Sequence, residues 1–306
     1  MSRSSLSSIP PSPPASERKD PRLLTPTTNA IPFVSVKHVR YYSTLHTVAV
    51  AVLFLLQFRA LVADPYRIML WDLCLLILLQ SAYCVACLPA TGTWANTTTH
   101  SSGNEAAGSG SGKLNKGSWV GSMRKRPAGL GRSGAASGGW KGKATPTIIA
   151  LALAMLLPPI PLTVLAHVLG APLYPIALIL NTAVLSLHVS LLTCMPLFYS
   201  HGVSGPAWRD IIAAWLPFDE PGVWGGSVGC FVGGWLGAIP IALDWDRDWQ
   251  AWPITVLVGC YGGWAAGKTL LGPIFLKGRR IDMSVGAEHE AIASHPDANT
   301  ADKKSR

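Results

Sequence analysis

Long apolar runs alternate with polar segments along most of the chain. Six runs of mostly apolar residues lie between residues 43 and 276. An α-helix rises about 1.5 Å per residue, so about 20 such residues cross the ~30 Å hydrocarbon core of a bilayer. The pattern therefore predicts an all-α fold, a polytopic membrane helical bundle of about six transmembrane helices. The expected spans are Ser43–Ala63, Arg67–Leu88, Thr147–Leu169, Leu173–Leu197, Gly222–Leu243 and Pro253–Leu276.

The polar segments around these runs predict the domain organisation. Residues 43–88 form an expected transmembrane hairpin, and residues 1–42 and 277–306 form expected disordered cytosolic tails. Residues 89–146 are dominated by Gly, Ser, Thr, Lys and Arg. Such a segment buries too little apolar area to offset its ordering entropy, so we expect a disordered cytosolic loop there. A four-helix transmembrane core should follow over residues 147–276.

The basic residues are distributed unevenly. Six Lys and Arg residues precede residue 43, eight lie in residues 89–146, and six follow residue 276. Basic loops stay on the cytosolic side of a membrane, so we expect both termini in the cytosol and residues 244–252 in the lumen. The net charge of +9 does not indicate a nucleic-acid partner, because the basic segments flank apolar spans and lack interleaved aromatic residues.

The last four residues add an expectation about location. They include Lys303 and Lys304, which resemble a dilysine retrieval signal of endoplasmic reticulum membrane proteins. The alternative is an ordinary basic tail. With the signal, the sequence predicts a multi-pass protein of the endoplasmic reticulum membrane.

Glycine recurs every fourth residue in the last two predicted spans. Steps of four residues keep side chains on nearly one face of a helix, so each set forms a continuous groove. Small residues in such a groove let two membrane helices pack closely. We expect these glycines to make a tight hairpin or to receive a partner subunit; they are Gly225, Gly229, Gly233, Gly237, Gly259, Gly263 and Gly267.

The segment between these two spans is acidic and rich in tryptophan. Trp245, Trp249 and Trp252 suit the membrane interface, and Pro253 suits the first turn of a helix. Arg247 is placed to pair with the neighbouring aspartates.

Three chemical interpretations compete with a structural role for this loop. The calcium-loop pattern fails, because Trp249 and Thr255 stand where Gly and Glu are required. Asp244-Trp245-Asp246 matches the metal-binding triplet of nucleotide-sugar transferases, but the chain has no nucleotide-binding domain. Paired carboxylates could act as acid and base, yet no nucleophile lies nearby. We therefore expect no catalytic residue and no metal here. Cys84-Val-Ala-Cys87 lacks the second pair that a zinc site needs.

The same loop carries a family resemblance. The run from Gly237 to Thr255 resembles the C-terminal signature of the Pig-F family of glycosylphosphatidylinositol (GPI) anchor biosynthesis, with Asp248 where proline is commoner. The likeness extends over roughly residues 190–276. The matching loop residues are Asp244, Trp245, Asp246, Arg247, Trp249, Gln250, Trp252 and Pro253.

The resemblance implies a function without catalysis. It implies a subunit that binds and stabilises the large phosphoethanolamine transferases, which act on mannoses of the GPI precursor in the endoplasmic reticulum. It implies no cofactor, and a membrane lipid such as the GPI precursor is a further candidate partner.

Polar residues inside the spans support a second hypothesis. Asp72, Asn181 and His188 fall within apolar runs, where ionisable groups are costly and often functional. The alternative is therefore a small integral-membrane lipid-modifying enzyme or lipid transporter that uses these three residues. Interhelical hydrogen bonding is the favoured explanation for Asn181 and His188, and a place at the membrane interface beside Trp71 explains Asp72. We expect Lys268, near the end of the last span, to reach the membrane surface.

Overall fold

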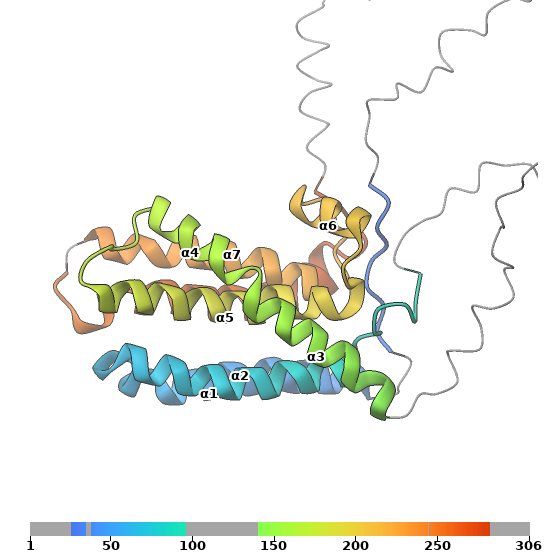
Figure 1. Cartoon of the computed structure of the whole chain (residues 1–306), viewed down its shortest axis with the longest axis horizontal. Helices are drawn as coiled ribbons and strands as arrows, with labels where there is room; N and C mark the ends of the chain where they lie inside the picture. Colours follow the sequence, from blue (N-terminus) through green and yellow to red (C-terminus); the bar gives the residue numbers. More distant parts are fainter. Residues whose placement is uncertain (1–25, 35–37, 96–139, 244, 282–306) are drawn as a thin grey trace, which may run out of the picture.

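The computed structural model describes residues 26–34, 38–95, 140–243 and 245–281. Its long helices run side by side along one axis (Figure 1). Helices α1 (Val39–Ala63) and α2 (Pro65–Cys87) form an antiparallel pair joined only by Asp64. The Asp64 carboxylate accepts a hydrogen bond from the Arg67 backbone N–H, and Pro65 occupies the first turn, so α2 begins on a capped N-terminus.

The next span is broken near its middle. Helix α3 (Trp140–Leu156) ends just before Pro158, and α4 (Pro159–Val168) begins just after it. Proline removes a backbone donor and clashes with the preceding turn, which explains the break. Both helices pack against α5 (Ile176–His201), which lies at the centre of the bundle (Figure 1).

The second half of the chain forms a close helical pair. After the short helix α6 (Gly205–Ile212), helix α7 (Val223–Ala238) runs away from α6, continued by the 3-10 turns η2 (Ile239–Leu243) and η3 (Asp248–Gln250). Helix α8 (Ile254–Ala266) returns and passes directly into the π-helix η4 (Gly267–Phe275).

The expected fold class is confirmed. Among the described residues, five helical segments are long and apolar enough to cross a membrane: Val39–Ala63, Pro65–Cys87, Gly142–Val168, Ile176–His201 and Val223–Leu243. The sixth predicted span corresponds to α8 with η4, which together cover residues 254–275 but change helix type at Gly267.

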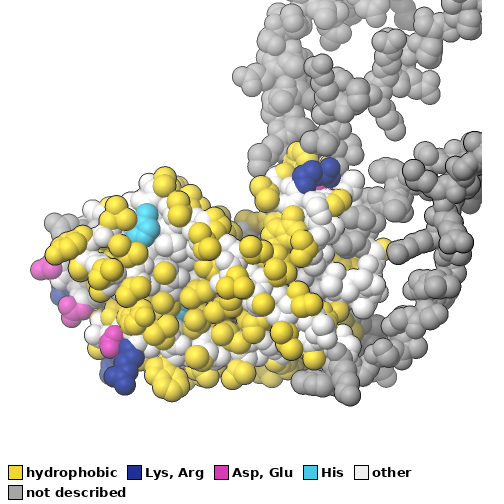
Figure 2. All heavy atoms as spheres, in the orientation of Figure 1, with side chains coloured by type: hydrophobic (Ala, Val, Ile, Leu, Met, Phe, Trp, Pro, Cys, Tyr) yellow, Lys and Arg dark blue, Asp and Glu magenta, His cyan; other side chains and the backbone are white. Residues whose placement is uncertain are grey.

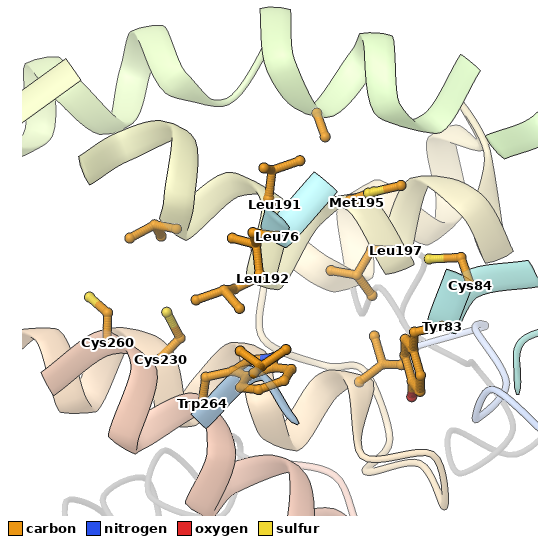
Figure 3. Packing of buried hydrophobic residues seen from close by; sticks show 14 of the residues in the cluster. Leu76, Tyr83, Cys84, Leu191, Leu192, Met195, Leu197, Cys230, Cys260 and Trp264 are labelled. Atoms are coloured by element: carbon orange, nitrogen blue, oxygen red, sulfur yellow. The ribbon is translucent and has the colours of Figure 1, made fainter. Parts of the chain in front are cut away.

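The surface has the character of a membrane bundle. Hydrophobic side chains cover the side of the bundle shown in Figure 2, whereas charged side chains gather toward its ends. The interior is also apolar. Leu76 of α2, Leu191 and Leu192 of α5, and Cys230 and Trp264 of the last pair all point into one packed core (Figure 3).

Both described ends of the chain pack at one end of the bundle, beside α6. The carboxylate of buried Asp210 accepts hydrogen bonds from the Thr27 and Thr28 backbone N–H groups at 2.8 and 2.9 Å. Arg280 donates to the carbonyls of Trp215 and Thr28. Residues 26–34 lie within the predicted N-terminal tail, so this part of the tail is attached to the folded bundle. Helix α1 also begins four residues before the predicted span.

Candidate functional site

The glycine row of α7 faces the row formed by α8 and the first residue of η4, and the two backbones are in direct contact. A methyl group built on any of the seven glycines in the two rows would lie within 3.0 Å of the opposite segment's backbone. Gly225 meets Gly267, Gly229 meets Gly263, and Gly233 meets Gly259, as an antiparallel register requires. Gly237 meets the backbone of Thr255. Both glycine rows are therefore filled by the contact within this chain.

The loop between these helices is held by its own polar groups. The Gln250 side chain donates to the Pro240 carbonyl at 2.6 Å and accepts from the Arg247 backbone N–H at 3.1 Å. The Trp252 indole N–H donates to the Thr182 hydroxyl of α5 at 3.0 Å. Gln250 and Trp252 of the family signature thus close the α7–α8 hairpin and attach it to α5.

Other signature residues point outward. The Trp245 side chain is 53% exposed, and its ring lies edge-on to that of Trp249 at 5.9 Å. Arg247 forms no ion pair with Asp246 or Asp248, contrary to the pairing expected with those two neighbours. Pro253 is buried and directly precedes α8, whereas Asp244 lies outside the described residues. Within the described part of the chain, no three His, Cys, Asp or Glu side chains are grouped so that they could hold a metal.

Two of the three intramembrane polar residues meet in a buried network. The Tyr261 hydroxyl donates to the Asp72 carboxylate at 2.6 Å and lies 2.8 Å from Nδ1 of His188. Nε2 of His188 lies 3.0 Å from the Met69 carbonyl. Gln57 donates to the other Asp72 oxygen at 3.3 Å. The network joins α1, α2, α5 and α8.

Asn181 does not join this network. Its side-chain oxygen is buried without a hydrogen-bond partner among the described residues. The space beside Asp72 has no room for a water-sized sphere. The three residues therefore do not converge on a cavity that could receive a substrate.

The expectation for Lys268 is wrong. Its side chain is only 3% exposed and does not reach the membrane surface. The ammonium lies 3.0 Å from Nδ1 of His46 and 3.5 Å above the centre of the Tyr83 ring. Lys268 belongs to η4, which packs against α1 and α7, so the side chain is directed into the bundle.

Sequence reasoning assigned no structural role to Asp219. This buried carboxylate accepts hydrogen bonds from the backbone N–H groups of Val223 and Trp224 at 3.0 and 2.9 Å, and so caps α7. Burial raises the pKa of Asp219 to about 6, although these two N–H groups act in the opposite direction. The Leu216-Pro217-Phe218-Asp219 segment carried a signal, because an aspartate just before an apolar run is typical of a helix N-terminus.

Asp210 shows the opposite shift. Burial acts to raise its pKa, but hydrogen bonds from Thr28 and Arg209 outweigh burial and hold the pKa below its usual range. Its contribution to stability is therefore present above about pH 4 and is lost as the pH falls through the lowered folded-state value. The contact that holds residues 26–34 should persist at neutral pH.

One further sequence prediction has no structural counterpart. Lys303 and Lys304 lie outside the described residues, so the retrieval signal stays a prediction.

Comparison with known proteins gives one consistent set of relatives. The family model "GPI biosynthesis protein family Pig-F" matches residues 45–272. "Glycosylphosphatidylinositol anchor biosynthesis protein 11" of Aspergillus fumigatus is 34% identical over 86% of this chain and 89% of its own length. The Neurospora crassa protein of the same name is 39% identical over 74% of this chain and 72% of its own.

A human protein matches a shorter part. The "GPI ethanolamine phosphate transferase, stabilizing subunit" of Homo sapiens is 35% identical over 38% of this chain and 52% of its own length. No solved structure matches the chain.

Proposed function

Because the chain belongs to the GPI biosynthesis protein family Pig-F, we propose that it is a non-catalytic subunit of a GPI ethanolamine phosphate transferase. It binds and stabilises the large transferase subunits that modify mannoses of the GPI precursor. The observation that carries this proposal is the match over residues 45–272, which includes the whole α7–α8 pair. The relatives are named as biosynthesis proteins or as a stabilising subunit.

The geometry supports a subunit better than the lipid-modifying enzyme or lipid transporter. The oxygens of Asp72 already accept hydrogen bonds from Gln57 and Tyr261, and no cavity opens beside them. The polar groups of Gln250 and Trp252 are used to fix the loop. A satisfied, closed network stabilises a fold and leaves no free group to react with a substrate.

The partner-binding surface in this proposal is the exposed tip of the α7–α8 hairpin. Trp245 and Trp249 project there, and Trp235 lies 72% exposed near the same end of α7. Tryptophan is enriched where binding energy concentrates in protein interfaces, because it buries a large area at a small entropic cost. The glycine rows cannot serve as this surface while they face each other.

The proposed location is the endoplasmic reticulum membrane, with both termini cytosolic and the tip in the lumen. The basic residues support this orientation. The end that holds α6 carries Arg40, Lys143, Arg209, Lys277, Arg279 and Arg280, whereas the other end carries Arg59, Arg67 and Arg247. The tip would then lie on the lumenal side, where the GPI precursor is a further candidate partner.

Co-purification of W245A/W249A from mild detergent tests the partnership. The double variant should recover at least tenfold less transferase subunit, because the tip loses both exposed indole rings. The control is W71A, which removes a tryptophan that is 64% exposed on α2 and should leave recovery unchanged. Full recovery with W245A/W249A would refute the tip as the contact. Absence of any transferase beside the unaltered protein would refute the subunit proposal itself.

A further inference from the structure

A cavity of about 480 Å³ lies between α1 and η4, at the end of the bundle that holds both described ends of the chain. Its walls are of two kinds. Arg40, Lys268, Lys277 and Glu220 supply charge, whereas Leu270 and Ile274 belong to its apolar side. Neither the family signature nor the tip of the α7–α8 hairpin contributes to this cavity.

The charges of the cavity are unbalanced. Glu220 forms ion pairs with Arg40 and, at 3.3 Å, with Lys277 at the rim. Lys268 has no carboxylate partner among the described residues, although it is almost fully buried. The groups nearest to its ammonium are the neutral His46 and Tyr83, and the buried carboxylate of Asp219 acts on it from farther away. Three cations thus face two carboxylates, of which only Glu220 lines the cavity, so the site keeps an excess of positive charge. A buried ammonium is favoured when a partner compensates its charge.

The apolar side faces the surroundings of the bundle. Leu270 is 44% exposed and Ile274 is 63% exposed. Because these residues lie in predicted membrane spans, hydrocarbon chains would cover them in a bilayer. A ligand that fits the whole cavity must therefore carry a negative group and an apolar chain.

We propose that this cavity binds an anionic phospholipid, with its phosphate against Arg40 and Lys277 and an acyl chain along Leu270 and Ile274. Lys268 adds the buried positive charge that favours an anionic over a zwitterionic headgroup. Free phosphate would satisfy the cations but not the apolar wall. The proposal does not depend on the transferase partnership, because every group involved belongs to this chain.

The test uses the full chain, purified in mild detergent, and follows its thermal midpoint during lipid titration. Phosphatidylserine should raise the midpoint, whereas phosphatidylcholine with the same acyl chains and inorganic phosphate should not. An equal response to phosphatidylcholine would overturn the headgroup assignment. A full response to inorganic phosphate alone would overturn the assignment to a lipid.

Rim variants locate the site without disturbing the core. The side chains of Arg40 and Lys277 are 75% and 56% exposed, so R40Q/K277Q should fold. This variant should weaken the apparent affinity for phosphatidylserine at least tenfold. The matched control R59Q/R67Q removes two exposed cations at the opposite end and should change the affinity less than twofold. Equal losses in both variants would show that net charge, not this cavity, attracts the lipid.

Glu220 separates lipid binding from a purely structural ion pair. E220Q removes the carboxylate that competes with the phosphate for Arg40 and Lys277. The lipid affinity should therefore rise severalfold, even if the midpoint without lipid falls. If the rim charges only stabilise the fold, E220Q should lower the midpoint and leave the lipid affinity unchanged, which would overturn the proposal.

Discussion

At the scale of single residues, hydrogen bonds decide what the intramembrane polar groups do. Asp72 and His188 lie far apart in sequence, but both contact the Tyr261 hydroxyl, and Nδ1 of His188 lies 3.7 Å from an Asp72 oxygen. Gln57 donates a further hydrogen bond to Asp72, and the Met69 carbonyl contacts the other ring nitrogen of His188. The buried polar atoms of both side chains therefore have partners. Interhelical hydrogen bonds in membranes average about 0.6 kcal/mol. This network should stabilise the bundle by more, because the removal of its central hydroxyl affects two buried partners.

The first prediction concerns that hydroxyl. Y261F should lower the free energy of unfolding by about 1–3 kcal/mol, because it leaves Asp72 and His188 each without one hydrogen-bond partner. The measurement is unfolding by a denaturing detergent in mixed micelles. Y174F is the control, since Tyr174 is 88% exposed and should tolerate the change. Equal stability of the two variants would show that the network contributes nothing beyond packing.

The polar residues also show what one sequence can and cannot predict. Asp72 and His188 stand out because ionisable groups are rare in apolar runs, but nothing in the pattern connects them to Tyr261. Asn181 shares a helix face with His188, yet the structure gives its oxygen no partner among the described residues. The prediction that Lys268 reaches the membrane surface was wrong because it rested only on the position of Lys268 near the end of its span. The cation's position depends on Tyr83 and His46, which lie on other helices.

At the scale of elements, the close packing of α7 against α8 depends on helix faces that carry glycine and therefore no side chain. The four-residue spacing of the glycines predicts which face of each helix is smooth, and these faces lie together in the structure. Spacing alone left open whether the smooth faces pair within the chain or receive a partner subunit. No sequence pattern marks the start of the π-helix η4, because the apolar run of α8 continues into it without a break.

The second prediction separates those two roles of the glycine rows. G233A should lower the free energy of unfolding of the isolated chain by about 1–3 kcal/mol, since the added methyl group collides with the backbone of α8. In the control G262A, the methyl group meets nothing within 4 Å, and the better helix former should leave stability equal or raise it by about 0.5–1 kcal/mol. Detergent unfolding of both purified variants gives the comparison. If isolated G233A keeps its free energy of unfolding but no longer binds the transferase subunit, the glycine row would belong to the partner interface.

At the scale of the whole molecule, the apolar runs determine most of the architecture. The number of spans and the break at Pro158 follow from the length of the runs and from proline chemistry. The docking of residues 26–34 does not follow, because a Ser- and Pro-rich segment gives no sign that Asp210 will bind its backbone. Contacts of this kind join residues more than 180 positions apart, beyond the reach of local patterns.

The third prediction concerns orientation in the membrane. With cytosolic termini, V203C beside α6 should react with a membrane-impermeant maleimide in sealed endoplasmic reticulum vesicles whose cytosolic face is outward. D248C at the hairpin tip should react only after the membrane is permeabilised. Both positions are exposed in the structure, so a difference in labelling reports the side of the membrane. The unaltered protein is the blank, because its six cysteines all lie within predicted spans. Labelling of D248C in intact vesicles would contradict the proposed orientation. It would show that the tip faces the cytosol and cannot meet a lumenal partner.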